Sequence, residues 1–297
     1  MVGTIGSRAP AVEGKASPGW RARLASLALA FMLMGFGSIE RLFAPGAEPW
    51  PRWERHDPKA TARVDHSVWE DWLGIYVSVG PDGIARVAYG RVTPADRARL
   101  DGYIGALAAV PVSSLDRAEQ RAFWVNLYNA LTVAVVLDHY PVGSIRDINL
   151  SRGLFGRGPW DRSLVSVEGE ALALNDIEHR ILRPGWRDPR IHYALNCAAL
   201  GCPNLLPNAF TSANTDGLLE QAARAYVNHP RGLTVRPDVV RLSSIYVWFA
   251  EDFGGKEGVL THLLHYADQP LRSALDQTVA AGADYAWDYD WRLNEAR

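Results

Sequence analysis

Residues 121–140, RAFWVNLYNALTVAVVLDHY, constrain the fold more than any other segment of the chain. Apolar residues such as Leu127 and Leu131 recur there at helical spacing, and few positions are charged. Asp116 and Glu119, just before this segment, resemble a capping box, which marks a helix start. A helix this apolar must be covered on more than one side, so we expect it to lie inside the domain.

The segments around this helix alternate between predicted hairpins and predicted helices. Hairpin turns are expected at Pro81-Asp82-Gly83, at Glu168-Gly169 and at Pro237-Asp238, each between two short apolar runs. Further helices are predicted over residues 94–109, 176–183, 216–228 and 256–267, and between Ser243-Ser244 and Gly254-Gly255. Residues 191–197 alternate like a strand that ends at Cys197. Without a regular βαβ rhythm, this order predicts an α+β fold: one mixed domain, residues 66–297, of helices packed with short strands and hairpins.

The N-terminal 44 residues differ in composition from the rest of the chain. Arg21 and Arg23 precede an uncharged run of 16 residues, Leu24 to Ile39. A membrane-spanning helix needs about 20 apolar residues, whereas a signal-peptide core needs about 7–15. Residues 1–44 therefore predict a signal peptide or a short membrane anchor, and a protein that is exported to the periplasm or anchored to the inner membrane. Residues 45–65, rich in Pro and Trp, are predicted to form a linker or a surface arm.

Charge and motif content exclude several classes of function. The 297 residues carry a formal net charge of −2, with basic residues scattered among acidic ones, so we expect no nucleic-acid partner. The chain lacks the glycine-rich dinucleotide fingerprint, a P-loop and the G-x-S-x-G elbow, and we expect no cofactor.

Both cysteines of the chain lie in one stretch, IHYALNCAALGCPNL, residues 191–205. Cys197 has three interpretations: a nucleophile, one half of a disulfide with Cys202, or a buried core residue. Export would make the disulfide chemically possible. The C-x₄-C spacing without a second cysteine pair is a poor zinc signature even with His192 and His179 added, so no metal is expected.

Two other groups of polar residues are candidates for chemistry. His179 follows Glu178 at the predicted start of a helix, where the dipole would lower the pKa of the imidazole and keep it neutral, as a base requires. The alternative is a surface histidine near a helix start. Asn126 and Asn129 share one face of the long apolar helix, which indicates either a buried polar network or a lined pocket.

Five motifs in order resemble those of a known family: RAFWVNLYNALTV, LNDIEHRILR, HYALNCAALGCPNL, SSIYVWFAEDFG and YDWRLN. Together they are similar to family 547 of the domains of unknown function (DUF547), over about residues 66–293. The resemblance implies no established activity, but it implies that bacterial members often carry an N-terminal export segment. It draws attention to the residues on which the family motifs centre: Asn126, Asn129, Glu178, His179, Asn196 and Cys197.

Two hypotheses of function follow. In the first, the chain is an exported thiol hydrolase or an acyl or amide transferase of the cell envelope. Cys197 attacks, His179 takes its proton, Glu178 or Asn126 orients the imidazole, and Asn196 with backbone N–H groups meets the oxyanion. The group types match papain-like enzymes, but the chain order does not, so the likeness is one of chemistry rather than fold. The expected binding residues are Tyr128, Asn129, His192, Tyr246 and Trp248.

In the second hypothesis, the chain is a non-catalytic envelope domain that binds a peptide, a glycan or another envelope ligand. Cys197 and Cys202 then form a structural disulfide. A redox pair is a third interpretation, although the spacing is wider than C-x-x-C.

Overall fold

The computed structural model describes residues 46–150 and 158–296. Within them lie eight α helices: α3 (Ser67–Tyr76), α4 (Pro94–Ala108), α5 (Arg117–His139), α6 (Arg183–Trp186), α7 (Thr215–Val227), α8 (Ile245–Trp248), α9 (Gly255–Tyr266) and α10 (Gln269–Ala280). The strands are β1 (Val77–Val79), β2 (Ala85–Val87), β3 (Val165–Val167), β4 (Glu170–Leu172), β5 (Leu233–Arg236), β6 (Val239–Ser243) and β7 (Asp284–Asp288). Several helices with small sheets make an α+β fold, as the sequence predicts.

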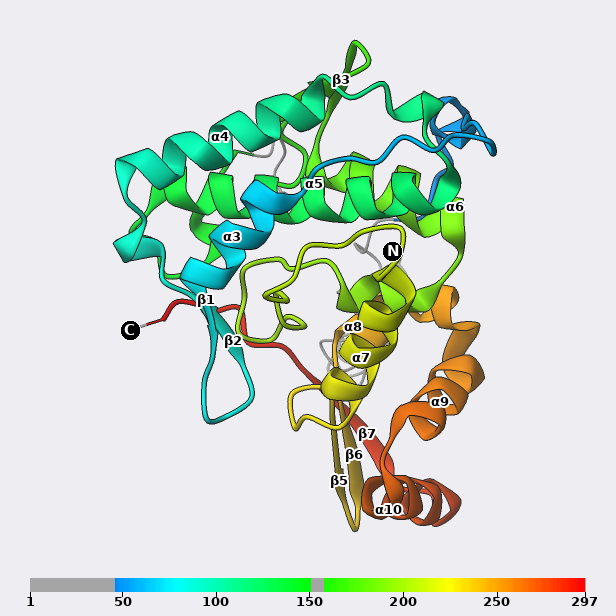
Figure 1. Ribbon diagram of the computed structural model, residues 1–297. Helices are drawn as coiled ribbons and strands as arrows, with labels where there is room; N and C mark the ends of the chain where they lie inside the picture. Colours follow the sequence, from blue (N-terminus) through cyan, green and yellow to red (C-terminus); the bar gives the residue numbers. More distant parts are fainter. Residues whose placement is uncertain (1–45, 151–157, 297) are drawn as a thin grey trace, which may run out of the picture. The chain divides into compact units, whose positions relative to one another are not determined.

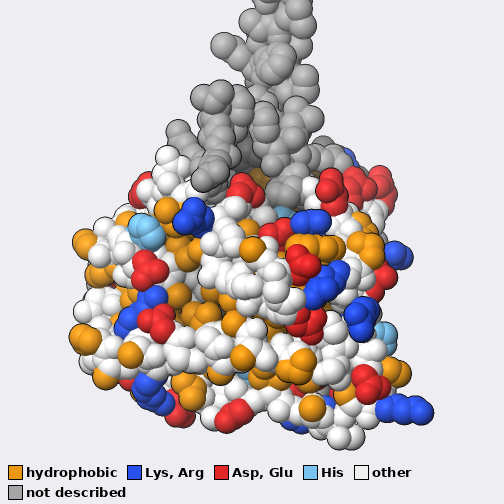
Figure 2. Space-filling model, turned by 90° about the horizontal axis from the view of Figure 1, so that it is seen from above, with side chains coloured by type: hydrophobic (Ala, Val, Ile, Leu, Met, Phe, Trp, Pro, Cys, Tyr) orange, Lys and Arg blue, Asp and Glu red, His pale blue; other side chains and the backbone are white. Residues whose placement is uncertain are grey.

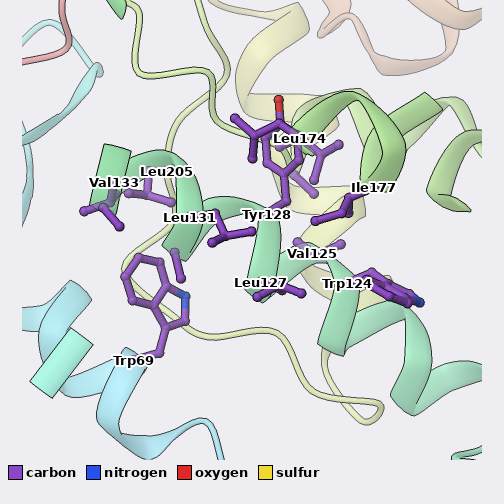
Figure 3. Close-up of a cluster of buried hydrophobic side chains, with 14 of the residues drawn as sticks. Trp69, Trp124, Val125, Leu127, Tyr128, Leu131, Val133, Leu174, Ile177 and Leu205 are labelled. Atoms are coloured by element: carbon purple, nitrogen blue, oxygen red, sulfur yellow. The ribbon is translucent and has the colours of Figure 1, made fainter. Parts of the chain in front are cut away.

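Helix α5 runs through the larger hydrophobic core, and the prediction of a long buried helix is confirmed (Figure 1). Helix α4 packs along α5, and α3 packs on α4. Trp69 of α3 joins Leu127 and Leu131 of α5 in this core (Figure 3). The side chain of Asp116 caps the helix by accepting the N–H of Glu119. Each apolar side chain buried in this way stabilises the fold by about 1.5–3 kcal/mol.

The second core lies around a three-stranded sheet of order β5-β6-β7. Strand β6 pairs with β5 antiparallel and with β7 parallel, and α10 packs against β5 and β6. The hairpin of β5 and β6 was predicted. Strand β7 was not, because its pairing partner lies about 45 residues earlier in the chain.

The other two predicted hairpins are confirmed as β1–β2 and β3–β4. At the second turn, Glu168 and Gly169 both have positive φ, 47° and 84°. A type I′ turn requires positive φ at both central positions, and this turn matches the right-handed twist of the two strands.

Three local predictions are wrong. Residues 191–197 form no strand: Pro189–Tyr193 is a 3₁₀ helix, which Pro189 and the capping side chain of Asp188 begin. The helix predicted over residues 176–183 has π instead of α geometry over Asp176–Leu182, and Asn175, at the predicted N-cap, bonds Asp161 with its side chain instead. The helix predicted before Gly254 is divided into α8 and a 3₁₀ segment, Ala250–Phe253. Neither α3 nor α10 was predicted.

The described part of the Pro- and Trp-rich segment lies against the domain. The N–H of Glu48 donates to the carbonyl of His179, and the N–H of Trp50 donates to that of Arg180. Trp53 is buried, with its ring centroid 5.0 Å from that of Trp124 on α5. The remaining short 3₁₀ segments are Pro51–Glu54, Tyr89–Arg91, Val112–Ser114 and Ile145–Asp147.

The predicted signal peptide or anchor lies outside the described residues. Among residues 46–150 and 158–296, no helix has the length and apolarity to cross a membrane. On the face seen in Figure 2, acidic, basic and apolar side chains are interspersed.

Candidate functional site

Both cysteines lie on a loop, residues 194–204, that we call the cysteine loop. Helix α5 holds its start: the Asn129 side-chain amide donates to the carbonyl of Ala194 and accepts the N–H of Asn196, both at 2.9 Å. Asn129 is buried, so these bonds satisfy polar groups that water does not reach. The asparagine therefore acts as part of a buried polar network, one of the two alternatives that its position on the helix indicated.

The side chain of Asn196 ties the two ends of the cysteine loop together. Its Nδ2 donates to the carbonyl of Pro203 at 2.9 Å, and its Oδ1 accepts the N–H of Ala198 at 2.9 Å. A further donor to that oxygen is Asn294 Nδ2, at 3.2 Å. Both polar atoms of Asn196 are thus engaged in shaping the loop.

The C-terminal segment, residues 289–294, lies along the cysteine loop (Figure 1). The N–H groups of Leu200 and Gly201 donate to the carbonyls of Arg292 and Asp290, both at 2.8 Å. A Cβ on Gly201 would meet the backbone nitrogen of Asp290 at 2.7 Å, so this close approach requires glycine.

Ala198, directly after Cys197, has φ 57°, an unusual conformation for a residue other than glycine. Backbone strain of this kind persists only where surrounding contacts enforce it, and it gathers at functional sites. Here the bond from the Ala198 N–H to Asn196 Oδ1 closes the turn that presents Cys197.

The two thiols touch each other and a tyrosine. Cys197 is partly exposed, whereas Cys202 is only 2% exposed, and both are free. The Sγ atoms are 2.8 Å apart, and the N–H of Cys197 also donates to Cys202 Sγ at 2.8 Å. The hydroxyl of Tyr289 lies 3.0 Å from Cys197 Sγ. Among the described residues, no imidazole is hydrogen-bonded to that sulfur.

These contacts make Cys202 the more acidic thiol of the pair. Burial works against ionisation there, but hydrogen bonds with the side chain and the N–H of Cys197 lower the pKa of Cys202. The positive charge of Arg231 acts in the same direction. The pKa of the Cys197 thiol is raised well above its usual value, first by its hydrogen bond to Cys202 and then by burial.

Glu178 and His179 belong to a separate buried ionic cluster, which also contains Arg183, His192 and Asp252. Asp252 accepts from Arg183 Nε at 2.6 Å, and His192 Nε2 lies 2.7 Å from the same carboxylate oxygen. The ring of His192 stacks on Phe249 at 4.2 Å between centroids, and the Arg183 guanidinium lies 4.7 Å from the centroid of the same ring.

The His179 imidazole is neutral at physiological pH. Burial lowers its pKa to about 4, and the positive charges of Arg183 and His192 contribute in the same direction. The expected direction is therefore found, but burial rather than a helix dipole is the leading cause. Arg183 donates to Nδ1 of this ring at 3.0 Å.

Glu178 relates the ionic cluster to the thiols. Its Oε1 lies 3.9 Å from His179 Nδ1 and 3.7 Å from His192 Nδ1. Its negative charge raises the pKa of Cys197, and it also raises the pKa of buried Tyr128, for which burial is the larger cause. The structure thus brings Glu178 into electrostatic contact with the Cys197 sulfur, whereas the polar side-chain contacts of His179 are with the ionic cluster.

The remaining candidates make contacts of their own. Both amide atoms of Asn126 bond the backbone of Phe210, at 2.7 and 3.0 Å. The hydroxyl of Tyr246 lies 3.2 Å from that of Tyr193, and Trp248 packs on Tyr289 with centroids 4.8 Å apart.

Sequence reasoning missed four residues of this region: Tyr289, Arg183, Asp252 and Arg231. Charged residues within otherwise apolar motifs were the available signal for Arg183 and Asp252. Tyr289 opens the last motif, YDWRLN, but nothing local links it to Cys197, 92 residues earlier. Among the described residues, no cluster of three or more histidine, cysteine or acidic side chains is arranged to hold a metal ion.

Residues 112–227 match the model of the family described as "Protein of unknown function, DUF547". The resemblance to DUF547 is confirmed over this range. The range contains α5, the Glu178-His179 pair and both cysteines, whereas the motifs at 243–254 and 289–294 lie beyond it. No curated protein and no solved structure matches the chain. The DUF547 region thus supplies the thiols and α5, and the C-terminal segment outside it supplies Tyr289.

Proposed function

We propose that this DUF547 protein is a thiol enzyme, a hydrolase or an acyl or amide transferase, in which Cys197 is the nucleophile. The observation that carries the proposal is the position of Cys197. This partly exposed residue lies on a tethered, strained turn, and its sulfur contacts two groups that can exchange a proton with it, Cys202 and Tyr289. A nucleophilic thiol needs such partners, because the thiolate is the attacking form.

Cys202 is the first proton acceptor in this proposal. The two sulfurs are 2.8 Å apart, and the Cys197 N–H and the Arg231 charge favour the thiolate form of Cys202, which can accept the Cys197 proton. His179, expected as the base, is the second acceptor. Its imidazole is neutral, but the lowered pKa makes it a weaker base than an exposed histidine, and the Glu178 carboxylate lies 3.9 Å from its Nδ1.

Tyr289 is the proposed donor to the oxyanion. The backbone N–H groups of Asn196, Cys197 and Ala198 are already bonded to Asn129, Cys202 and Asn196. The Tyr289 hydroxyl, 3.0 Å from the attacking sulfur, is placed to meet the oxygen of a carbonyl that this sulfur attacks. Asn126 and Asn196 serve by shaping the site around them.

The setting of the reaction is also a proposal. Export to the periplasm or anchoring at the inner membrane, and an envelope peptide or glycan as substrate, rest on the sequence of residues 1–44 alone. Tyr128, Asn129, His192, Tyr246 and Trp248 are the proposed lining of the binding site.

An acylation assay with p-nitrophenyl acetate tests the nucleophile. We expect an acetyl group on Cys197, found by peptide mass spectrometry, and its loss with nitrophenol release in Cys197→Ala. Tyr289→Phe should slow acylation at least tenfold, while Tyr285→Phe on β7, away from the thiols, should leave the rate unchanged. Equal turnover in Cys197→Ala and the unaltered protein would contradict the proposal.

The second candidate is the non-catalytic binding domain with a structural disulfide. The observation in its favour is the 2.8 Å separation of the two Sγ atoms, which places both sulfurs ready to bond. Non-reducing mass spectrometry of the isolated protein separates the candidates. A Cys197–Cys202 disulfide that is present in every molecule and resists reduction in the folded state favours the binding domain. A free Cys197 that can be alkylated favours the thiol enzyme.

A further inference from the structure

The two cysteines differ in ways that suit different steps of one reaction. Cys197 is the partly exposed residue of the two, so it is the one that we expect an incoming molecule to meet. Cys202 is buried, and its sulfur lies 2.8 Å from that of Cys197. We therefore expect Cys202 to attack a mixed disulfide on Cys197 and not a disulfide in solution. A more exposed and a buried thiol in direct contact suit thiol–disulfide exchange, because one sulfur can attack a substrate disulfide and the other can resolve the mixed disulfide.

We propose that Cys197 and Cys202 form a reversible dithiol that exchanges with low-molecular-weight disulfides, with Cys197 as the attacking thiol and Cys202 as the resolving thiol. This activity is independent of the acyl chemistry proposed above, since it needs neither Tyr289 nor the ionic cluster. It also differs from a permanent structural disulfide, because both the bonded and the reduced states are populated by the folded protein.

The exchange balances with a disulfide such as glutathione disulfide as oxidant. The Cys197 proton passes to the Cys202 thiolate, and the Cys197 thiolate attacks one sulfur of the substrate. The substrate S–S bond breaks, and the first glutathione thiolate leaves with the proton from Cys202. The Cys202 thiolate then attacks Cys197 Sγ, the mixed disulfide breaks, and a second glutathione thiolate leaves. The dithiol monoanion and one glutathione disulfide thus become a protein disulfide, one glutathione thiol and one thiolate.

The surroundings of Cys202 support its role as the resolving thiol. The N–H of Cys197 donates to its sulfur, and the Arg231 guanidinium adds positive charge nearby. Arg231 is held in place by bonds to the carbonyl of Leu200 and to Asn204, at 3.0 and 2.6 Å. Its Nε is buried and has no hydrogen-bond partner among the described residues. We therefore place Arg231 as a positioning residue that favours the Cys202 thiolate.

The loop between the two cysteines tolerates closure of the bond. The sulfurs need to approach by only about 0.8 Å to reach the usual S–S length of about 2.05 Å. Hydrogen bonds of the Asn129 and Asn196 side chains fix the cysteine loop, and the hydrogen bond from the Gly201 N–H to the Asp290 carbonyl fixes the segment before Cys202. We therefore expect the rest of the domain to keep its arrangement when the Cys197–Cys202 disulfide forms and when it is reduced.

Equilibration in glutathione buffers tests the proposal on the full chain. The protein is incubated at pH 7 over a wide range of reduced-to-oxidised glutathione ratios, quenched with acid, alkylated and analysed by mass spectrometry. We expect the Cys197–Cys202 disulfide to rise and fall reversibly with the ratio in a single transition. In Cys202→Ser, glutathione should accumulate on Cys197, whereas Cys197→Ser should leave Cys202 unmodified in the folded protein.

A kinetic measurement tests the role of Arg231 separately. Arg231→Gln should prolong the life of the mixed disulfide about threefold near neutral pH, because the Cys202 thiolate loses a nearby positive charge. Arg224→Gln, an exposed arginine on α7, is the matched control and should not change it.

Two outcomes overturn the exchange proposal: no protein disulfide at any ratio, or a disulfide that no ratio reduces without unfolding. Accumulation of glutathione on Cys202 in place of Cys197 overturns the assignment of roles. A protein that exchanges glutathione but is inert to p-nitrophenyl acetate retains this proposal and loses the acyl one, so the two failures are distinguishable.

Discussion

Asn129, in the middle of the buried helix α5, accepts the backbone N–H of Asn196 at 2.9 Å, and so fixes the residue that precedes Cys197. The two residues are 67 positions apart in the chain. Through this bond a buried helix of the core sets the position of the cysteine loop. The side chains of such a site are positioned more accurately when their backbone is held by packed helices than when it is free.

Replacing Asn129 with Ala should destabilise the protein by about 2–4 kcal/mol, because the buried carbonyl of Ala194 and N–H of Asn196 both lose their partners. Urea denaturation followed by tryptophan fluorescence measures the loss. Asn175→Ala is the control: its side chain bonds Asp161 in an exposed position, and we expect a change below about 1 kcal/mol. Similar effects of the two substitutions would contradict the assigned role of Asn129.

Gly201→Ala should also destabilise the protein, and it should shift the reactivity of Cys197. The new Cβ would lie 2.7 Å from the backbone nitrogen of Asp290, so the cysteine loop and the C-terminal segment must separate. We expect a loss of about 1–3 kcal/mol and a changed rate of iodoacetamide labelling. Gly102→Ala in α4, where a Cβ meets nothing within 4 Å, should instead stabilise by up to about 1 kcal/mol. A stable Gly201→Ala protein with unchanged labelling would refute the close-approach argument.

Asp252→Asn should remove the negative partner of Arg183 and His192 and leave buried positive charge uncompensated. Breaking a fully buried ion pair costs about 3–5 kcal/mol, and the 19% exposure of this side chain reduces our expectation to about 2–4 kcal/mol. Asp101→Asn is the matched control, since its pair with Arg97 is exposed and should contribute less than about 1 kcal/mol. Thermal unfolding of the three proteins at pH 7 provides the comparison.

Acidification should weaken the fold between about pH 6.5 and pH 4, in part through His179. Burial lowers the folded-state pKa of this imidazole to about 4, so the unfolded chain binds the extra proton first as the pH falls. His179 therefore costs no stability above pH 6.5, and the loss grows until the pH reaches about 4, amounting to about 1–3 kcal/mol.

The pH profile of His179→Gln checks this assignment. The free energy of unfolding should depend less steeply on pH in this variant, while His56→Gln, a change at an exposed histidine, should reproduce the unaltered slope. Parallel profiles for all three proteins would show that His179 does not titrate as described. His262, whose burial lowers its pKa to about 4 as well, should preserve part of the slope in His179→Gln.

Local patterns were sufficient for the elements whose hydrogen bonds close within a few residues. The 3.6-residue periodicity of α5, the Asp116 cap and the Glu168-Gly169 turn depend only on neighbours in the chain, and each was predictable. The grouping of Asn196 with Cys197 and of Glu178 with His179 was equally visible, because those residues are adjacent.

The strand-like alternation of residues 191–197 shows where local patterns fail. The N–H of Asn196 finds its acceptor on Asn129 instead of a neighbouring strand, and Asp188 caps a 3₁₀ turn just before it. Tertiary hydrogen bonds thus override a local propensity that is worth only a fraction of a kcal/mol per residue.

By itself, the sequence determined that the chain has a buried central helix, several hairpins and two cysteines five positions apart. Only the tertiary structure decided that Cys197 meets Cys202 and Tyr289 and that His179 pairs with Arg183. The physical reason is the range of the interactions. Helices and turns are chosen by contacts a few residues apart, whereas the partners of a sulfur or an imidazole depend on which distant segments share one core.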